Sequence, residues 1–520
     1  MAKVNIITAA EAAAQVPDGA IINTEGFVQG GLAETLNKAL EARFLETGHP
    51  TDLTVFTVAG QGAGVGTGSD HFAHPGMIKR LIAGHYNLAP TLKAMAINGE
   101  IEAYNLPQGT MAQMLRDAAG KRPGTITHVG LNTYVDPRIE GAKVNSKTTE
   151  DIVKLIEIEG EEKLLFKSQP LDVTFIRGTY ADENGNISLE HEAATLDATS
   201  LAQCAHNNGG KVFVQVEKVV AAGALDPRLV KIPGIYVDGV IIAEDDDNDQ
   251  IYKQGYDPSM TGDIRVPLGS LEPPKLDAKK IIARRAAMEL KEGAVVNLGI
   301  GVPEFVSAVA NEEGIGDFMT LTVEAGPVGG VPQGGSRFIG SVNPECILDQ
   351  PYQFDFYDGG GISQAFLGLA QADKEGNLNV SKFSGNIAGC GGFINISQNA
   401  QKVYYLGTFT TKGLKIATGD GKLTITQEGS SLKFVDTVEQ ITFSGPSAVK
   451  VGQPVMFITE RAVFKLTDKG LVLTEIAPGI DLQTQVLDLM EFAPIVADDL
   501  KLMDARIFTD AVMGLSLIHI

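Results

Sequence analysis

The sequence has 520 residues, a formal net charge of −22, 44% hydrophobic residues and 20% charged residues. These values predict at least two soluble globular domains and exclude a largely disordered chain. The 64 acidic against 42 basic residues, together with the absence of tryptophan, argue against a nucleic-acid partner.

The cysteines and the apolar runs of the sequence indicate the cellular compartment of the protein. Cys204, Cys346 and Cys390 are too few and too scattered for a disulfide framework or a zinc cluster. The N-terminal segment lacks the long apolar stretch of a secretory signal, and no uncharged apolar run reaches the roughly 18 residues of a membrane span. We therefore expect a cytoplasmic protein that has no membrane partner.

Helix and strand signals alternate in the N-terminal region. Thr8 and Glu11 predict a capping box at the start of an Ala-rich helix. Apolar residues recur every four positions from Leu32 to Phe44 and predict a helix that stops at Gly48. The β-branched run at 53–58 predicts a strand. Strands that alternate with helices favour a mostly parallel sheet covered on both faces.

Several short motifs occur twice and in the same order. Residues 181–186 read ADENGN and residues 372–377 read ADKEGN. In both copies, a Lys-Val pair followed by an aromatic residue begins 26 residues after the motif's glycine. Earlier in each half, residues 18–23 match residues 292–297 in pattern. The sequence therefore predicts two diverged copies of one α/β domain.

The segment between the copies differs in composition. Residues 244–275 carry an acidic run from Glu244 to Asp249 and several prolines, which predicts an exposed linker. The acidic run lacks the glycine and the distal glutamate of an EF-hand loop, so a solvated turn is favoured over a calcium site. We predict an α/β fold of two similar open domains, residues 1–243 and 276–514, with mostly parallel sheets and the active site between them.

Several common catalytic motifs are absent or incomplete. The glycines from Gly60 to Gly68 are out of register with a dinucleotide fingerprint and favour a flexible turn. No P-loop and no nucleophile elbow of the G-x-S-x-G type occurs. The pair His71 and His74 has no nearby third ligand, and His191 has no second histidine four residues on, so we expect no metal.

Glu324 is the strongest candidate for chemistry. It ends a strand-like run, 319–323, just before Gly326. Its counterpart in the first copy is Val58, so only one copy carries a carboxylate at the sheet edge where open α/β folds bind ligands. The pattern is typical of an active-site carboxylate, and it is also compatible with a strand-end glutamate that faces solvent.

A second glycine cluster, 389–393, follows the second repeat motif. Backbone without side chains can present N–H groups to an oxyanion or to a thioester carbonyl. A tight turn between a strand and a helix explains the same composition equally well.

Taken together, these motifs resemble family I of the coenzyme A transferases, and most closely the single-chain bacterial propionate or acetate CoA-transferases. The resemblance runs from about Lys3 to Gly514. The motifs that carry it are Glu25-Gly26-Phe27, 104–109 (YNLPQG), 125–130 (TITHVG), 323–326 (VEAG), 389–393 (GCGGF) and 474–479 (TEIAPG).

The resemblance implies a role for four residues. Glu324 matches the family's catalytic glutamate, whose carboxylate attacks an acyl-CoA thioester without a general base. Gly391 and Gly392 match the family's glycine-rich loop near this centre. Gln108 is the candidate side-chain donor from the first domain. Two oxyanions form in turn during such a reaction, which calls for donors on both sides of Glu324.

The implied activity is transfer of CoA between short-chain acyl-CoA, such as propionyl-, acetyl- or butyryl-CoA, and a free carboxylate such as acetate. The reaction would be ping-pong, through a glutamyl-CoA thioester, in short-chain fatty acid metabolism. Coenzyme A would be a substrate, with no permanently bound cofactor and no metal. The resemblance also implies a homo-oligomer, such as a tetramer. The alternatives are an acyl-CoA thioester hydrolase, a 3-oxoacid CoA-transferase and a non-catalytic acyl-CoA-binding module.

Overall fold

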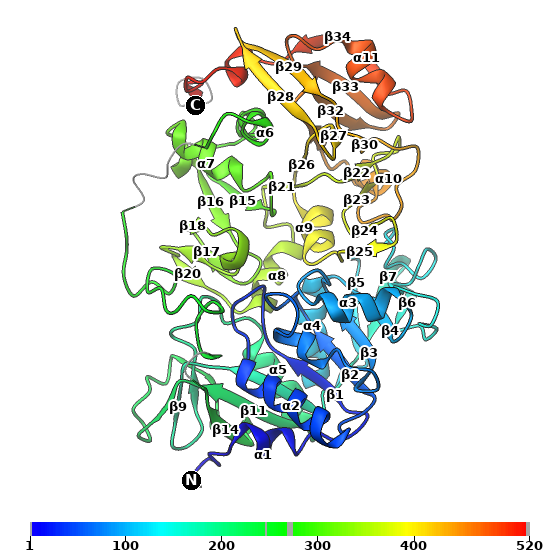
Figure 1. Ribbon diagram of the computed structural model, residues 1–520. Coiled ribbons are helices and arrows are strands. Elements are labelled where there is room, and N and C mark those ends of the chain that lie inside the picture. Colours follow the sequence, from blue (N-terminus) through cyan, green and yellow to red (C-terminus); the bar gives the residue numbers. More distant parts are fainter. Residues whose placement is uncertain (1–2, 245–246, 268–273, 516–520) are drawn as a thin grey trace. The chain divides into compact units, whose positions relative to one another are not determined.

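The computed structural model describes residues 3–244, 247–267 and 274–515 (Figure 1). The chain divides into two compact units, each of which is discontinuous in sequence. Unit 1 comprises Met1–Val266, Val323–Asp355 and Gly385–Asn395, and unit 2 comprises Pro267–Thr322, Phe356–Ser384 and Ile396–Ile520. The domain boundaries expected from the sequence stay a prediction.

Unit 1 is built on a seven-stranded sheet in the order β14-β11-β8-β1-β2-β3-β4, in which all neighbouring strands are parallel. Its strands are β1 (Ile21–Thr24), β2 (Leu53–Thr57), β3 (Ile78–Ala83), β4 (Glu102–Asn105), β8 (Val173–Arg177), β11 (Lys211–Val216) and β14 (Gly239–Ile242). Two smaller sheets, β5-β7-β6 and β12-β9-β10-β13, accompany it. Their strands are β5 (Gly124–Thr127), β6 (Val153–Ile158), β7 (Glu161–Lys167), β9 (Tyr180–Asp182), β10 (Ile187–Ser188), β12 (Lys218–Val220) and β13 (Val230–Ile232).

Helices of unit 1 form two separate apolar clusters with this sheet. One cluster contains buried residues of α1 (Ala9–Ala13), α2 (Glu34–Thr47) and α3 (Pro90–Ile97). The other contains those of α4 (Gln108–Ala119) and α5 (Ala198–Asn207). The sheet is therefore covered on both faces, as the alternation of strand and helix signals predicts.

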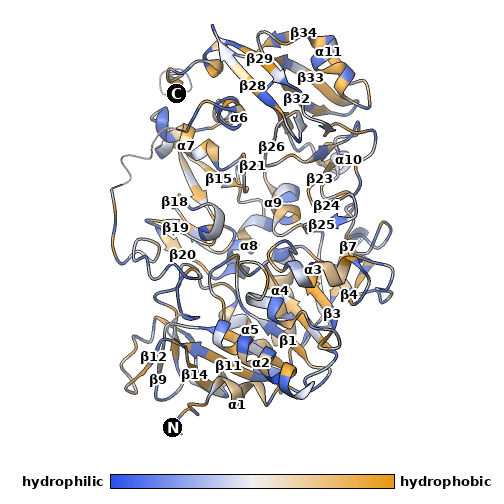
Figure 2. Ribbon diagram, in the orientation of Figure 1, coloured by the Kyte–Doolittle hydropathy of each residue, from blue (hydrophilic) through white to orange (hydrophobic). Residues whose placement is uncertain are grey.

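The local signals near the N-terminus are confirmed in detail. Thr8 and Glu11 form the predicted capping box at the start of α1. Helix α2 ends at Gly48, whose φ of +73° is a left-handed conformation that glycine adopts without a steric penalty. Figure 2 shows hydrophilic and hydrophobic residues mixed along α2, as expected for a helix with one buried face.

Two segments from the second half of the sequence belong to unit 1. They contain the short strands β17 (Pro327–Val328), β18 (Val331–Pro332), β19 (Ser341–Val342), β20 (Cys346–Ile347) and β25 (Asn386–Ile387). Val323 and Ala325 pack into an apolar cluster with Phe27 and Leu196. This cluster attaches the turn that carries Glu324 to the end of the first sheet.

Part of the segment that the sequence predicts to be an exposed linker packs into unit 1. Ile251 and Met260 are buried in the same apolar cluster as Phe27. Asp247 is also buried and forms an ion pair with Lys38, so it is not part of a solvated turn. Apolar side chains lie between the charged residues of this segment and pack into the cluster. The overall composition of the segment does not reveal them. The middle of the acidic run, residues 245–246, lies outside the described residues.

The sheet of unit 2 repeats the strand order of the first sheet. The order is β16-β15-β21-β26-β31-β32-β33-β34, and its first five strands are mutually parallel. Strands β16-β15-β21-β26-β31 correspond in order to β2-β1-β8-β11-β14 of unit 1. The repeat motifs fall on matching strands, which confirms the internal duplication. Strand β32 is antiparallel to both its neighbours, and β34 is parallel to β33.

The bounds of the unit 2 strands are β15 (Ala294–Leu298), β16 (Met319–Thr322), β21 (Gln364–Gly368), β22 (Gln371–Ala372), β23 (Leu378–Asn379), β24 (Lys382–Phe383), β26 (Val403–Leu406), β27 (Thr410–Thr411), β28 (Lys415–Gly419), β29 (Lys422–Gln427), β30 (Ser431–Leu432), β31 (Val455–Ile458), β32 (Ala462–Thr467), β33 (Gly470–Ile476) and β34 (Ile495–Leu502). Its helices are α6 (Ala278–Ala287), α7 (Phe305–Glu312), α10 (Gly445–Val451) and α11 (Leu482–Gln485). Helices α8 (Gln350–Asp358) and α9 (Phe393–Asn399) each begin in unit 1.

Candidate active site

Glu324 lies in a tight turn of unit 1. The backbone N–H of Val323 donates to Pro327 O at 2.9 Å, and that of Gly326 donates to Val323 O at 3.0 Å. The Gln353 amide also donates to Val323 O, at 3.1 Å. Gly326 has a φ of +131°, and a Cβ there would lie 2.0 Å from Leu348 O, so this position requires glycine. The turn therefore holds the glutamate backbone in one conformation.

The Glu324 carboxylate is half-buried and accepts a hydrogen bond from the backbone N–H of Gly392. Burial raises the pKa of this carboxyl to about 7, and the hydrogen bond from Gly392 opposes the shift. A Cβ at Gly392 would lie 1.9 Å from Glu324 Oε2 and 3.0 Å from the Phe354 ring. Only glycine lets the backbone approach the carboxylate this closely.

The glycine loop 389–392 is attached to the carboxyl ends of β3 and β4. The N–H of Gly391 donates to Gly84 O at 2.8 Å, and Gly391 O accepts from the N–H of Gln108 at 2.9 Å. The N–H of Cys390 donates to the Asn105 side-chain oxygen at 3.0 Å. The loop thus sits at the sheet edge where open α/β folds bind their ligands.

Gln108 is the first residue of α4 and follows the helix cap Pro107. Its side chain is 2% exposed, and its Nε2 has no hydrogen-bond partner among the described residues. Its Oε1 lies 3.7 Å from the position that a Cβ on Gly391 would take. A buried amide donor without a partner is costly, which is typical of a group that binds a ligand.

All four residues predicted for the site belong to unit 1, because the segments 323–355 and 385–395 are part of that unit. Glu324 meets Gly392, while Gln108 meets Gly391. A half-buried carboxylate, a backbone N–H on it and an unpartnered amide donor near the same loop can together perform nucleophilic acyl transfer.

Sequence reasoning missed two residues around the loop. Asn105 and Tyr134 are buried, and the Tyr134 hydroxyl donates to the Asn105 side chain. Asn105 belongs to the 104–109 motif, which is one of the motifs that carry the family resemblance. That membership could have identified it from the sequence. Tyr134 carries no comparable sequence signal.

The histidines singled out in the sequence have protein partners. His71 lies between Glu34, at 3.1 Å, and Glu41, at 2.6 Å, and His74 contacts Glu41 at 2.7 Å. His191 pairs with a glutamate, Glu217, at 3.0 Å. Across residues 3–244, 247–267 and 274–515, no group of three or more His, Cys, Asp or Glu side chains is placed to hold a metal ion.

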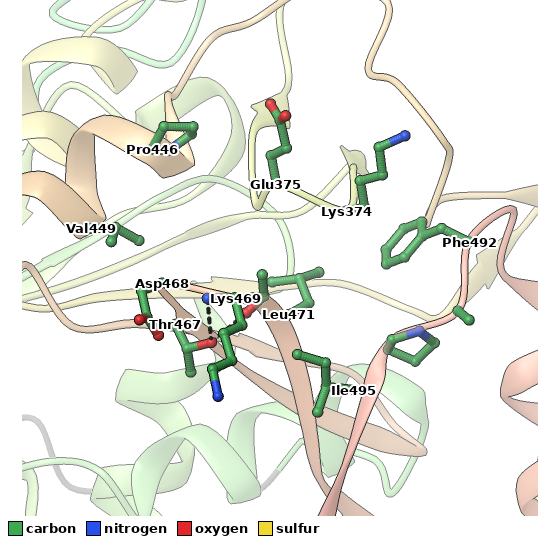
Figure 3. A pocket seen from close by; sticks show the side chains of 13 residues that line it. Lys374, Glu375, Pro446, Val449, Thr467, Asp468, Lys469, Leu471, Phe492 and Ile495 are labelled. Carbon is green, nitrogen blue, oxygen red and sulfur yellow. Dashed lines mark hydrogen bonds between the residues drawn. The ribbon is translucent and has the colours of Figure 1, made fainter.

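Unit 2 contains a cleft of about 590 Å³ that includes none of the predicted site residues (Figure 3). Its apolar residues include Leu471, Phe492 and Ile495. Figure 3 shows the amines of Lys374 and Lys469 pointing in different directions, and two acidic residues line the cleft as well. This balance of charge favours no class of ligand.

Comparison with known proteins decides the family. Residues 6–243 match the family model described as "Coenzyme A transferase". The chain is 44% identical over 521 residues to the caffeate CoA-transferase of Acetobacterium woodii, covering 98% of this chain and 99% of that protein. The chain belongs to the coenzyme A transferase family. The acetate CoA-transferase YdiF of Escherichia coli K12 is a second relative of this coenzyme A transferase, 42% identical over 98% of this chain and 96% of its own.

A solved structure agrees with this assignment. The acyl-CoA transferase YdiF of Escherichia coli O157:H7, described as a thioester complex with CoA, superposes with a TM-score of 0.93. The match has 42% sequence identity and covers 98% of this chain and 97% of that one. The predictions of an α/β fold with mostly parallel sheets and of a CoA-transferring enzyme are therefore confirmed. Within the described residues, no helix has the length and apolar character needed to cross a membrane.

Proposed function

We propose that this coenzyme A transferase moves CoA between a short-chain acyl-CoA, such as propionyl-CoA, and acetate, through a glutamyl-CoA thioester on Glu324. The observation that carries the proposal is the half-buried Glu324 carboxylate held by the N–H of Gly392. The acceptor is proposed from the acetate CoA-transferase named among the relatives.

The reaction proceeds by two exchanges at one carboxylate. A Glu324 oxygen attacks the thioester carbonyl of acyl-CoA, and the tetrahedral intermediate expels the CoA thiolate to leave a mixed anhydride. The thiolate then attacks the glutamyl carbonyl and expels the acyl group as a free carboxylate. Acetate attacks the resulting glutamyl-CoA and reverses the sequence, giving acetyl-CoA and free Glu324. Thioester energy is conserved throughout, so no ATP is consumed.

Each tetrahedral intermediate carries an oxyanion that needs a donor. The Gly392 N–H faces the Glu324 carboxylate and would stabilise the oxyanion formed on the glutamyl carbon. The unpartnered Nε2 of Gln108 would stabilise the oxyanion formed on the substrate carbonyl. The backbone N–H of Gln108 donates to Gly391 O, so the residue that carries one donor is tied to the neighbour of the other.

The rate of glutamyl-CoA formation should depend on pH through Glu324. Burial raises the pKa of this carboxyl to about 7, and only the carboxylate is a nucleophile. We expect the second-order rate constant for propionyl-CoA to fall about tenfold per pH unit below a midpoint near this pKa, and to be level above it. Rapid-quench measurements across this pH range test the expectation. A midpoint at the ordinary glutamate pKa of about 4.3 would contradict it.

Replacing Gln108 with glutamate should slow the chemical step, because it removes the amide donor and keeps the size of the side chain. We expect a loss on the order of 10²- to 10³-fold in the rate of glutamyl-CoA formation. Gln169→Glu, in a partly buried loop of the same unit, is the matched control and should retain wild-type activity. Equal rates for wild type and the Gln108 variant would remove Gln108 from the mechanism.

An exchange experiment separates the transferase from a hydrolase. Radiolabelled propionate is mixed with propionyl-CoA and enzyme, without acetate. A ping-pong transferase returns label to propionyl-CoA, because free propionate attacks glutamyl-CoA. A hydrolase consumes propionyl-CoA with a net loss of thioester, and a binding module neither labels nor consumes it. A separate assay compares acetoacetate with acetate as the acceptor and so distinguishes the 3-oxoacid CoA-transferase.

The preferred acyl group is a separate question. The relatives named above are a caffeate and an acetate CoA-transferase at similar identity. One methylene changes transition-state binding by only about 1–3 kcal/mol, so several short acids should be accepted. A panel of acetate, propionate, butyrate and caffeate as acceptors measures the preference. Faster transfer to caffeate than to every short acid would overturn the proposed substrate class.

We also propose that the enzyme is a cytoplasmic homo-oligomer, such as a tetramer, that takes coenzyme A as a substrate and keeps no resident cofactor or metal. Light scattering of the purified protein tests the oligomer. Activity that survives exhaustive treatment with a chelator tests the independence from metal.

A further inference from the structure

Asn105 lies at the carboxyl end of β4, and both the nitrogen and the oxygen of its buried side-chain amide form hydrogen bonds. Its Nδ2 donates to Ala83 O and to Gly84 O, each at 2.8 Å. Its Oδ1 accepts from the N–H of Cys390 at 3.0 Å and from the Tyr134 hydroxyl. The side chain is 3% exposed, so these bonds compete little with water.

These bonds converge on the glycine loop from two directions. Gly84 O, which Asn105 orients, accepts the N–H of Gly391 at 2.8 Å. Cys390, the residue just before Gly391, donates its backbone N–H to Asn105 Oδ1. One amide therefore fixes both the residue that precedes Gly391 and the carbonyl that Gly391 binds. The next N–H along the loop is that of Gly392, which faces Glu324.

The space around Asn105 is filled by the same loop. A Cβ at Gly389 would lie 2.9 Å from Asn105 Nδ2 and 2.8 Å from His85 Cα. The Cys390 sulfur lies 3.4 Å from Leu106 O, and burial raises the pKa of its thiol to about 12, so it stays neutral. These contacts pack the loop closely against Asn105 and its neighbours.

We infer that Asn105, supported by Tyr134, is a positioning residue that aims the Gly392 N–H at the glutamyl carbon during glutamyl-CoA formation. The inference rests on the proposed role of Glu324. The hydrogen bonds of Asn105 go to the loop and to its supports rather than to Glu324, so we expect it to act through the loop. Misplacing a catalytic group by about 1 Å can cost on the order of 100-fold in rate, whereas substrate binding elsewhere is unaffected.

Asn105→Asp is the primary test, because it keeps the shape of the side chain and removes both donated hydrogen bonds. Single-turnover reactions with propionyl-CoA give a maximum rate of glutamyl-CoA formation and a half-saturating concentration. We expect the maximum rate to fall on the order of 10- to 100-fold, while the half-saturating concentration changes less than about threefold.

Asn145→Asp is the matched control. Asn145 also donates to two backbone carbonyls, Ala96 O and Ile101 O, and accepts from Thr148, and none of these bonds involves the glycine loop. It should lose thermal stability and keep the wild-type maximum rate. If both variants lose rate in proportion to their stability, Asn105 is merely structural and the inference is wrong.

Tyr134→Phe keeps the test decisive should Asn105→Asp fail to fold. It removes a single hydroxyl from Asn105 Oδ1 and leaves the other three bonds. We expect a smaller decrease, about 3- to 10-fold, in the same maximum rate. An unchanged maximum rate in Tyr134→Phe and in any folded Asn105 variant would overturn the inference. Failure of the wild type to form any adduct would instead contradict the proposed function, so the two failures are distinguishable.

Discussion

Replacing Glu324 with alanine is expected to abolish CoA transfer, with a loss on the order of 10⁴-fold or more in turnover. The variant removes the carboxylate that the Gly392 N–H holds, and with it the proposed nucleophile. Glu324→Asp keeps the charge but shortens the side chain by one methylene. It should still lose on the order of 100-fold, because its oxygen no longer reaches the substrate carbonyl. Steady-state assays with propionyl-CoA and acetate measure both effects.

Glu345→Ala is the matched control for these variants. It removes an exposed glutamate from the same segment of unit 1 and should leave turnover unchanged. Thermal unfolding of all three proteins separates loss of fold from loss of chemistry. Turnover by Glu324→Asp at the wild-type rate would remove this residue from the nucleophile's role.

Gly392→Ala is the second substitution with a large expected effect. The new methyl carbon would lie 1.9 Å from Glu324 Oε2, far inside van der Waals contact, and 3.0 Å from the Phe354 ring. Either the carboxylate rotates away or the loop withdraws, and both movements break the hydrogen bond from the Gly392 N–H. We expect the rate of glutamyl-CoA formation to fall on the order of 10³-fold.

Gly419→Ala provides the control for this glycine. It lies in β28, its φ is outside the positive range, and a Cβ there would have no neighbour within 4 Å. That variant should match the wild type in rate and stability. A fully active Gly392→Ala would mean that the close approach of loop and carboxylate is not needed for chemistry.

The features that could be predicted from the sequence are those that depend on neighbouring residues or on the internal repeat. The capping box of Thr8 and Glu11 and the glycine stop at Gly48 depend on a few neighbouring residues, and both are present. The duplication could be found because matched motifs fall on matched strands. Glu324 stood out because its counterpart, Val58, is apolar. The roles of Glu324, Gln108 and the two glycines came from family resemblance and stay a proposal.

The remaining features depend on contacts between distant parts of the chain. Asn105 and Cys390 are 285 positions apart, so no periodicity or spacing connects them. Ile251 and Met260 are buried although they lie among charged residues and prolines, because the apolar cluster that receives them is assembled from remote segments. Composition averages over such a segment and misses two well-placed apolar side chains.

The role of Glu324 as the nucleophile is tested most directly by mass spectrometry of the intact enzyme and its peptides after mixing with propionyl-CoA and no acceptor. We expect a covalent CoA adduct on the peptide that contains Glu324. Added acetate should discharge this adduct with formation of one acetyl-CoA per site. An adduct on another residue, or steady loss of propionyl-CoA without acetate and without an adduct, would mean that Glu324 is not the nucleophile of a transferase.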